Sequence, residues 1–394
     1  MPFTLEPSYD DNPRLQELVT DLRRYLHEEL IPYEHERGIT AESKLDRPTL
    51  EHVWKRSHEL GFYGISLPAE LGGQGLNLVE LCALKEELTA SGAALSHSVL
   101  GDMGGPLRAG SIVKYATEYQ LERYLLPVIR GERACCFSIT EEDAGSDVRR
   151  MTTTATPDGD SYVLTGKKVF SSAAPFADFA IVVARTAPAP EATDEEVYSA
   201  FLVDLDSPGC SVLDGEVPMS GQQMEGDLVF DGCRVPAANL LGEIGQGLRI
   251  GIGRITLNRL LHCPSLIGAA RRAWDLSVAY SRNRVAFGRP LLALQAIQHK
   301  LAEMATDVYA ARSTVLATAA RADRGVNIAV EANMCKLLTA ESCFRVADQA
   351  VQIHGKAGLT RGNEVEQIFR TLRMFRVVTG TSEIHKNAIA KSLS

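Results

Sequence analysis

The stretch FSITEEDAGSDV, residues 137–148, lies where the pattern of the sequence changes. Upstream of it, apolar residues recur at three- and four-residue spacing, as Leu15, Leu18, Leu22 and Leu26 do, which predicts amphipathic helices. Downstream, short β-branched runs are broken by Gly, Pro and Asp, which predicts strands. The stretch itself is rich in Thr, Asp, Gly and Ser, which favour turns and caps. Taken alone, it is most simply a turn-rich connection.

This change of pattern predicts three domains, at residues 1–130, 131–243 and 244–394. The first is predicted to be all-α. The second carries strand-like runs in the order SYVLTG, KKVFSS, FAIVVART, AFLVDL, GCSVLD and DLVFDGCRV. Within it APAPEATDEE, residues 187–196, predicts a solvated loop. The third has long helical segments near residues 246–285, 294–323, 327–354 and 364–374, and a last one from about Thr381, which predicts a four-helix bundle.

Composition excludes several classes of function. With 41 basic and 50 acidic residues the net charge is −9, which argues against nucleic acid or an anionic membrane as the main partner. Eight cysteines form no C-x-x-C pair and no signal peptide is visible, so we expect free thiols in the cytoplasm. The sequence also lacks G-x-G-x-x-G, G-x-x-x-x-G-K-[ST], G-x-S-x-G and H-E-x-x-H. We therefore expect neither a Rossmann dinucleotide site nor a metal centre.

Six blocks taken together resemble the acyl-CoA dehydrogenase family over essentially the whole chain. In order they are GISLPAELGGQGL (64–76), FSITEEDAGSDV, GKKVFSSA (166–173), SRNRVAFGRPL with Gln295 (281–295), QIHGKAGL (352–359) and GTSEIHKNAIA (380–390). The resemblance implies an α+β multi-domain fold: a helical N-terminal domain, a middle β-barrel or sheet domain and a C-terminal four-helix bundle. It also implies FAD between the last two domains, reaching a neighbouring subunit of a homotetramer or homodimer.

The resemblance further implies which residues hold the flavin ring. Thr140, with backbone groups of Phe137 and Ile139, is expected to contact the ring, and the Ser172 hydroxyl is expected to reach flavin N5. Hydrogen-bond donors at those places would stabilise the negative charge of reduced flavin. Phe170 is expected to flank the ring, with a strand core position as the alternative. Gly145 and Ser146 are expected beside the flavin phosphate, with Ser146 also near the substrate.

The remaining matched positions lie in the last domain. By resemblance Arg284, Phe287 and Gln295 bind the pyrophosphate and adenosine across the subunit interface, where a guanidinium suits phosphate oxygens. Gln352, Gly355, Thr381 and Glu383 match the adenylate side. Arg259 and Gly380 are expected near the thioester. The implied substrate is an acyl-CoA or acyl-carrier-protein thioester, and the implied electron acceptor is electron-transfer flavoprotein or oxygen.

The glutamate base typical of the family is missing. The residue before Gly380 in RVVTGTSEIHK is Thr379, and the position that a second branch of the family uses is Asn258. Neither side chain accepts a proton at neutral pH. A relocated base is one interpretation, with Asp102 in VLGDMGGP as the candidate; its alternative is a solvated or capping loop aspartate. His262 is a weaker candidate, because such histidines are usually packed in a core.

Two other interpretations need no base. The flavin could reduce an activated double bond, eliminate a leaving group or activate oxygen, with Thr379 donating a hydrogen bond. Alternatively the chain could be a catalytically silent flavin-binding subunit. The simplest prediction is an FAD-dependent oxidoreductase that acts on an acyl thioester by α,β-dehydrogenation, with hydride transfer to flavin N5 and an atypical base.

Overall fold

The computed structural model describes residues 3–186 and 197–393, so the predicted loop at 187–196 lies outside the described residues. The chain forms two compact units. One comprises Met1–Ala41, Asn77–Ser96 and Thr256–Ser394, and is helical. The other comprises Glu42–Leu76 and His97–Ile255, and contains the sheet. In the described part of the chain, no helix has both the length and the apolar character that a membrane crossing requires.

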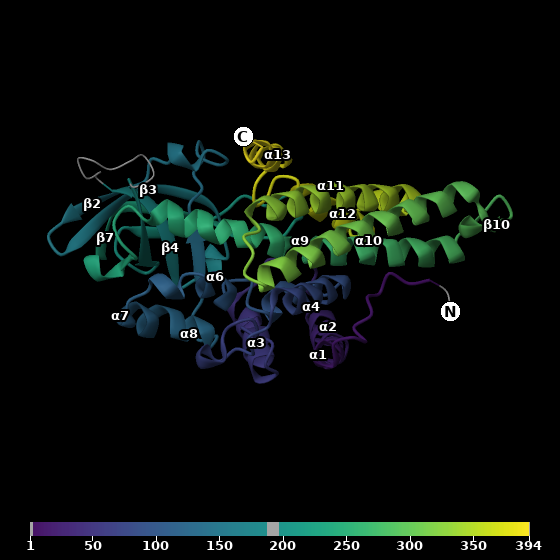
Figure 1. Ribbon diagram of the computed structural model, residues 1–394, viewed down its shortest axis with the longest axis horizontal. Helices are drawn as coiled ribbons and strands as arrows, with labels where there is room; N and C mark the ends of the chain where they lie inside the picture. Colours follow the sequence, from purple (N-terminus) through teal and green to yellow (C-terminus); the bar gives the residue numbers. More distant parts are fainter. Residues whose placement is uncertain (1–2, 187–196, 394) are drawn as a thin grey trace. The chain divides into compact units, whose positions relative to one another are not determined.

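Long helices dominate the helical unit, as the apolar spacing predicts. They are α9 (Gly247–Asn283, of which the residues from Thr256 belong here), α10 (Gln295–Asp323), α11 (Ala329–His354), α12 (Glu364–Met374) and α13 (Ser382–Lys391). Figure 1 shows α9 to α12 lying alongside one another. The apolar faces of α9 to α12 meet in one core. Its buried residues include Leu260 of α9, Val308 of α10, Val346 of α11 and Leu372 of α12. The predicted helical C-terminal part is confirmed.

Helices from the start of the chain complete this unit. They are α1 (Pro13–Tyr25), a π-helical turn at Leu26–Leu30, α2 (Ile31–Arg37) and α4 (Leu78–Ala90). Each long one begins as its sequence predicts. Asn12 caps α1 ahead of Pro13, and Asn77 caps α4 in a reciprocal pair with Glu80.

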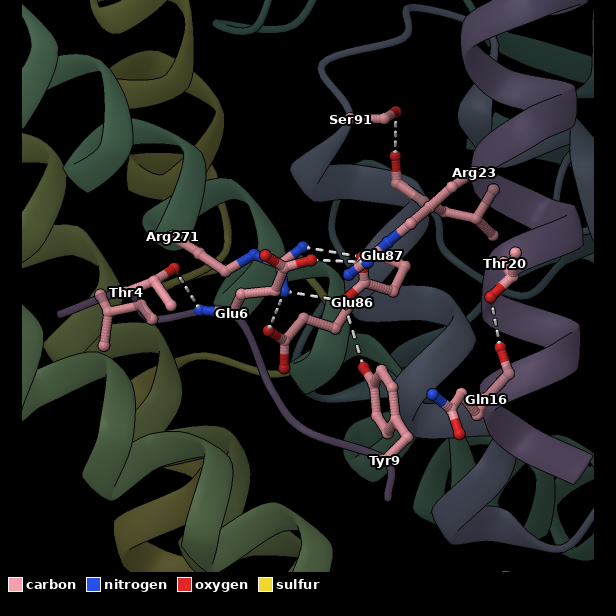
Figure 2. Close-up of polar contacts among 12 residues, drawn as sticks. Thr4, Glu6, Tyr9, Gln16, Thr20, Arg23, Glu86, Glu87, Ser91 and Arg271 are labelled. Carbon is pink, nitrogen blue, oxygen red and sulfur yellow. Dashed lines mark hydrogen bonds and ion pairs between the residues drawn. The ribbon is translucent and has the colours of Figure 1, made fainter. Parts of the chain in front are cut away.

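A buried ionic network joins α4 to its neighbours (Figure 2). Glu86 and Glu87 of α4 are each 4% exposed. Arg271 of α9 donates to Glu87 at 2.8 and 3.0 Å and to Glu86 at 3.1 Å. Arg23 of α1 and the Tyr9 hydroxyl also donate to Glu87, at 2.8 and 3.1 Å. Burial alone would raise the pKa of Glu87, but the hydrogen bonds and charges of Arg271 and Arg23 outweigh it, so the pKa lies below its usual value.

The sheet unit is built on eight strands in its described part, in the order β6-β7-β3-β2-β4-β5-β8, with β1 parallel to β4. The strands are β1 (Cys135–Ser138), β2 (Thr154–Asp158), β3 (Ser161–Ser172), β4 (Phe179–Thr186), β5 (Tyr198–Asp204), β6 (Cys210–Asp214), β7 (Glu225–Pro236) and β8 (Leu240–Leu241). All the predicted strand runs are found. SYVLTG and KKVFSS form the single strand β3.

Short helices accompany the sheet. They are α3 (Arg47–Glu59), α5 (Ser96–Val99), α6 (Pro106–Gly110), α7 (Glu118–Gln120), a π-helical turn at Leu121–Leu125 and α8 (Leu126–Ile129). Tyr124 and Val128 from this helical segment pack with Phe179, Ile181 and Leu202 of the central strands in one core cluster. The opposite face of the sheet has its own cluster, which includes Phe201 and Phe230. The sheet is therefore buried on both faces at its centre.

Candidate functional site

The stretch FSITEEDAGSDV leaves the sheet at the end of β1 and forms a tight loop. Glu141 and Ala144 bridge each other through backbone hydrogen bonds of 3.3 and 3.1 Å. The carbonyl of Thr140 accepts a hydrogen bond from the Val169 N–H of β3 at 3.0 Å. Thr140 is half-buried, whereas Gly145 and Ser146 are exposed. A Cβ added to Gly145 would meet no atom within 4 Å, so packing within the chain leaves this loop open to a ligand.

An ion pair beneath the loop fixes it to β3. Lys168 of β3 is fully buried and donates to Oε1 of Glu141 at 2.8 Å. The Glu141 carboxylate also accepts from the backbone of Thr152 and Thr153 at 2.6 and 2.9 Å, and from the Thr152 hydroxyl at 2.8 Å. Burial raises the pKa of Glu141, but the bond from Lys168 and the other donors lower it more, to about 2. Sequence reasoning missed this pair because its members are 27 residues apart.

A bulge in β3 turns Phe170 out of the core. The β3–β7 register shifts between Lys168 and Ser171, and Phe170 has φ 52°. Its side chain is 53% exposed, so the alternative of a strand core position is wrong. Ser172 follows two residues later, where regular pairing has resumed opposite Glu225 of β7, and is half-buried. Of the other two expected ring contacts, Phe137 is half-buried and Ile139 is buried in the unit's core.

The loop that carries Asp102 is tied to Ser172 by Arg108. Arg108 Nε donates to the carbonyl of Asp102 at 2.8 Å, and its Nη1 donates to the carbonyl of Ser172 at 3.1 Å. The Ser172 hydroxyl donates to Oε1 of Glu225 at 3.0 Å. The structure thus brings Asp102, predicted from sequence, to the same place as Ser172. Arg108 and Glu225 were missed, since neither lies in a recognisable motif.

In the helical unit, Arg284 begins a hairpin formed by β9 (Val285–Ala286) and β10 (Arg289–Pro290). The Arg284 carbonyl accepts from the Leu291 N–H at 2.8 Å, and the side chain is exposed. Phe287, at the tip, is 92% exposed with φ 52°. Gln295 follows as the first residue of α10 and is exposed. The hairpin therefore presents an exposed cation, Arg284, and an exposed aromatic ring, Phe287, to solvent.

Of the four expected adenylate-side residues, Gln352 and Gly355 lie at the same end of the bundle as this hairpin. Thr381 and Glu383 do not, because they lie at the start of α13, whose His385 contacts Asn333 near the start of α11. Lys300, near the start of α10, donates to Gln349, near the end of α11, at 2.5 Å. Gln352 and Gly355 follow on α11 and at its C-terminus, and both are exposed. A hollow of about 410 Å³ opens here. Its lining comes from the end of α9, the end of α11 and the start of α12: Leu276, Ala279, Tyr280, Asn283, His354, Ala357, Asn363, Glu364 and Val365.

The segment that lacks the family's glutamate is backed by basic groups. Thr379 is half-buried with φ 64°, and Asn258 is also half-buried. Thr381 caps α13 by accepting from the Ile384 N–H at 3.2 Å, and Glu383 lies exposed in the first turn. A carboxylate, Glu341, does contact this segment: it accepts hydrogen bonds from Arg376 at 3.0 Å and from Ser382 at 2.6 Å. Glu341 is therefore already paired.

Three of those basic groups are Arg259, Lys336 and His385. Lys336 is fully buried, and its Nζ donates to the carbonyl of Phe375 at 2.5 Å. Burial first, and then the charge of Arg259, lower the pKa of Lys336 to about 8. Burial, followed by the charges of Lys336 and Arg259, lowers the pKa of His385 to about 4. Burial also lowers the pKa of Arg259, whose Nε has no hydrogen-bond partner among the described residues.

The hydrogen bonds of His385 define its tautomer. The amide nitrogen of Asn333 donates to the Ala329 carbonyl at 2.7 Å, so its Oδ1 must be the acceptor for His385 Nδ1, 2.9 Å away. In the neutral ring, Nε2 therefore carries the lone pair, and it has no partner in the described structure. A Cβ on Gly380 would lie 3.3 Å from this atom. The ring thus backs the glycine that follows Thr379.

The other histidines considered are packed. The ring of His354 stacks on Tyr280 at 4.4 Å, and its Nδ1 lies 2.8 Å from the Ala350 carbonyl. His262 packs at 5.8 Å from the ring of Phe375 and is half-buried. Both histidines therefore pack against an aromatic ring, as expected for histidines in a core.

Comparison with known proteins covers almost the whole chain. Residues 12–132, 136–233 and 245–394 match the models for the N-terminal, middle and C-terminal domains of acyl-CoA dehydrogenase. The chain is 35% identical to acryloyl-CoA reductase (NADH) of Anaerotignum propionicum, over 96% of this chain and 94% of that protein. It is 33% identical to caffeyl-CoA reductase-Etf complex subunit CarC of Acetobacterium woodii, over 98% of each.

A solved structure shows the same fold. The crystal structure of a glutaryl-CoA dehydrogenase from Mycobacterium smegmatis in complex with FADH2 superposes with a TM-score of 0.85 and 25% sequence identity. The match covers 98% of this chain and 96% of that one. Proteins described as reductases and as dehydrogenases are therefore both similar to this chain over its full length.

Proposed function

Because this chain belongs to the acyl-CoA dehydrogenase family, we propose that it is an FAD-dependent oxidoreductase acting on a CH–CH bond of an acyl thioester. One observation carries the proposal. The non-glycine residues with positive φ in the described chain are Phe170, Ala173, Phe287 and Thr379. Three hold positions assigned to the flavin or to catalysis, and Ala173 adjoins Ser172. Such backbone costs about 1–3 kcal/mol per residue and concentrates at ligand sites.

The residues of the sheet unit fit one end of FAD. When bound, the isoalloxazine supplies a two-electron acceptor. Phe170 offers an exposed ring to flank it, and Thr140 and Ser172 offer hydroxyl groups. Glu141 and Lys168 hold the Thr140 loop against β3, so the two hydroxyl groups are presented from elements tied to each other. A preorganised donor such as the Thr140 hydroxyl stabilises negative charge on a reduced ring, whereas the Ser172 hydrogen is donated to Glu225 in this structure.

The residues of the helical unit fit the other end. Arg284 presents a guanidinium to solvent, suited to pyrophosphate oxygens. Gln295, Gln352 and Gly355 lie at the same end of the bundle, beside the hollow of about 410 Å³. Phe287, 92% exposed, suits contact with a second copy of the chain in a homodimer or homotetramer. We place this assembly in the cytoplasm, because all eight cysteines are free thiols.

Asp102 is the residue that we assign as the base for dehydrogenation. It is half-buried, and Arg108 fixes its backbone to that of Ser172. A carboxylate there would take the α-proton of the acyl group while the β-hydrogen leaves as hydride. Arg259 and the backbone at Gly380, with Ser146, would contact the thioester. The acyl group and the choice between coenzyme A and a carrier protein are open to experiment.

A second candidate is the reverse direction, reduction of an α,β-unsaturated thioester. Addition of hydride to the β-carbon places negative charge on the thioester oxygen. Arg259 and Lys336 would stabilise that charge, since Lys336, with a pKa of about 8, is mostly protonated at neutral pH. The chain's similarity to acryloyl-CoA reductase supports this direction. Electrons would come from, or go to, an electron-transfer flavoprotein, as its similarity to the Etf complex subunit suggests.

One experiment tests the function and chooses the direction. The purified protein is mixed without oxygen with a panel of saturated acyl thioesters, and the flavin absorption near 450 nm and the product mass are recorded. Bleaching with loss of two hydrogens supports dehydrogenation. The chemically reduced protein is then mixed with unsaturated thioesters, where re-oxidation with gain of two hydrogens supports reduction. A protein that neither contains nor takes up FAD contradicts the proposal.

A further inference from the structure

Ser172 and Glu225 form a hydrogen-bonded pair just beyond the bulge that carries Phe170. They lie directly opposite each other in the antiparallel β3–β7 ladder, which places their side chains on one face of the sheet. The hydroxyl Oγ lies 3.0 Å from Oε1 of the carboxyl. The second carboxyl oxygen, Oε2, is buried and has no hydrogen-bond partner among the described residues. A carboxyl group is thus held with half of its hydrogen-bonding capacity unused.

Among the described residues, no lysine or arginine forms an ion pair with this carboxyl. Arg108 is the charge that acts on Glu225, but its Nε and Nη1 donate to the carbonyls of Asp102 and Ser172. Of the carboxylates on the neighbouring strands, Asp214 of β6 pairs with Lys44 at 3.0 Å and Asp227 of β7 pairs with Lys167 at 2.8 Å, while Asp231 of β7 is exposed.

Burial therefore dominates the titration of this carboxyl. Burial raises the pKa of Glu225, and the hydrogen bond from Ser172 and the charge of Arg108 lower it by less. The carboxyl takes up a proton at a higher pH than an ordinary glutamate does.

We propose that Glu225 is a positioning residue that sets the direction of the Ser172 hydrogen bond at the flavin face. A hydroxyl has one hydrogen to donate and two lone pairs. When Glu225 is ionised, Ser172 donates to it and can only accept from the ring. When Glu225 is protonated, it donates to Ser172, and the serine hydrogen is free to point at the ring. This inference rests on the proposed function, because it requires a flavin beside Ser172.

The consequence is coupling between a proton and the redox state of the cofactor. The expected contact of Ser172 is flavin N5, which accepts a hydrogen bond in the oxidised ring but would carry a hydrogen and donate one after hydride transfer. Reduction therefore favours the arrangement in which Ser172 accepts from the ring and Glu225 is ionised. The carboxyl O–H bond breaks as water takes up the proton on reduction, and it re-forms on oxidation.

The test is the pH dependence of the midpoint potential of bound FAD, in the wild-type protein and in Glu225→Gln. Where Glu225 is protonated in the oxidised protein and ionised in the reduced protein, the release of one proton per two electrons makes the fall of potential with pH shallower by about 30 mV per pH unit. We expect that shallower slope in the wild type and its loss in the variant. Asp231→Asn, an exposed position on the same strand, should keep it.

Ser172→Ala provides an independent check if Glu225→Gln does not fold. Without the hydroxyl the carboxyl has no link to the ring, so the shallower slope should again disappear while FAD remains bound. The inference is overturned if Glu225→Gln binds FAD and titrates with the wild-type slope. Failure of the wild-type protein to bind FAD, or to react with any thioester, would instead count against the proposed function.

Discussion

The ammonium group of Lys168 donates to Oε1 of Glu141 across 2.8 Å, with side-chain exposures of 0% and 7%. Both residues serve the loop predicted to hold the flavin: Glu141 lies within it, and Lys168 lies on β3, whose Val169 N–H bonds to Thr140. The buried pair therefore holds the loop in place and is not itself exposed to a ligand.

Removal of one partner should destabilise the protein. Lys168→Met leaves the Glu141 carboxylate buried with its cation gone, and such losses typically cost about 3–5 kcal/mol of folding free energy. We also expect weaker FAD retention, because the loop loses its tie to β3. Urea denaturation and the flavin content of the purified protein measure the two effects. Lys167→Met is the control, as its pair with Asp227 lies at the surface, and it should change neither measurement appreciably.

The same pair predicts a dependence of stability on acid. The pKa of Glu141 falls from 4.5 to about 2 on folding, so its ionised form stabilises the folded state. That contribution is complete above about pH 4.5 and is lost as the pH falls toward 2. The stability difference between the wild type and Glu141→Gln should therefore shrink over this range. Denaturant titrations at pH 7, 4 and 3 measure it, and a constant difference would contradict the assignment.

The network in Figure 2 should respond in the same way. Arg271→Ala leaves Glu86 and Glu87 buried without their shared cation, and we expect a loss of about 3–5 kcal/mol in unfolding free energy. The adjacent Arg272 pairs with Glu364 at 2.7 Å and is 34% exposed, so Arg272→Ala should cost about 1 kcal/mol or less. Equal losses in the two variants would show that burial does not set the strength of this network.

Arg284→Ala should release FAD without unfolding the bundle. The side chain is exposed, and the hydrogen bonds of Arg284 to other described residues are made by its backbone, so removal of the side chain costs the fold little. The expected result is a colourless or partly loaded protein with an unchanged circular dichroism spectrum. Arg282→Ala, at an exposed position two residues earlier, should keep its flavin. Full retention of FAD in Arg284→Ala would remove this residue from the cofactor site.

Asp102→Asn should slow the bleaching of the flavin by a saturated thioester. Loss of a positioned base typically lowers a rate by about 10²–10⁴-fold. FAD content should not change, because Asp102 is not among the residues expected to hold FAD, and the Arg108 bond to the Asp102 carbonyl does not depend on the substituted group. Asp206→Asn, at a turn between β5 and β6, serves as the surface control. An unchanged rate would leave Asp102 without a catalytic role and favour reactions that need no base.

Most helices and strands could be predicted from the local pattern of apolar residues in the sequence. Strand β3 is an exception. Gly166 suggests a break between SYVLTG and KKVFSS, but β3 continues through it. The glycine is needed for another reason, since an added Cβ would lie 2.6 Å from the Thr153 hydroxyl. A close approach between strands is a tertiary fact that a single glycine does not reveal.

Only some residues of the candidate site could be predicted from the sequence. Motifs indicated the loop at 137–148, the hairpin at Arg284 and the position of Thr379, because each is a short contiguous pattern. They could not indicate Glu225, which is 53 residues from Ser172, or Lys336 and His385, whose common surroundings depend on the packing of α11 with α13. Side-chain partners that meet only through sheet register or helix packing leave no mark in local sequence.

Threonine at position 379 is an unfavourable occupant of its own backbone. At φ 64° a β-branched side chain is more strained than an unbranched one, so a glutamate placed there would meet a lower conformational penalty. Folding thermodynamics therefore does not separate this chain from a relative with a carboxylate at that point. One substitution, Thr379→Glu, would place a carboxylate there. The residue at position 379 is therefore set by the reaction that the protein catalyses more than by the stability of its fold.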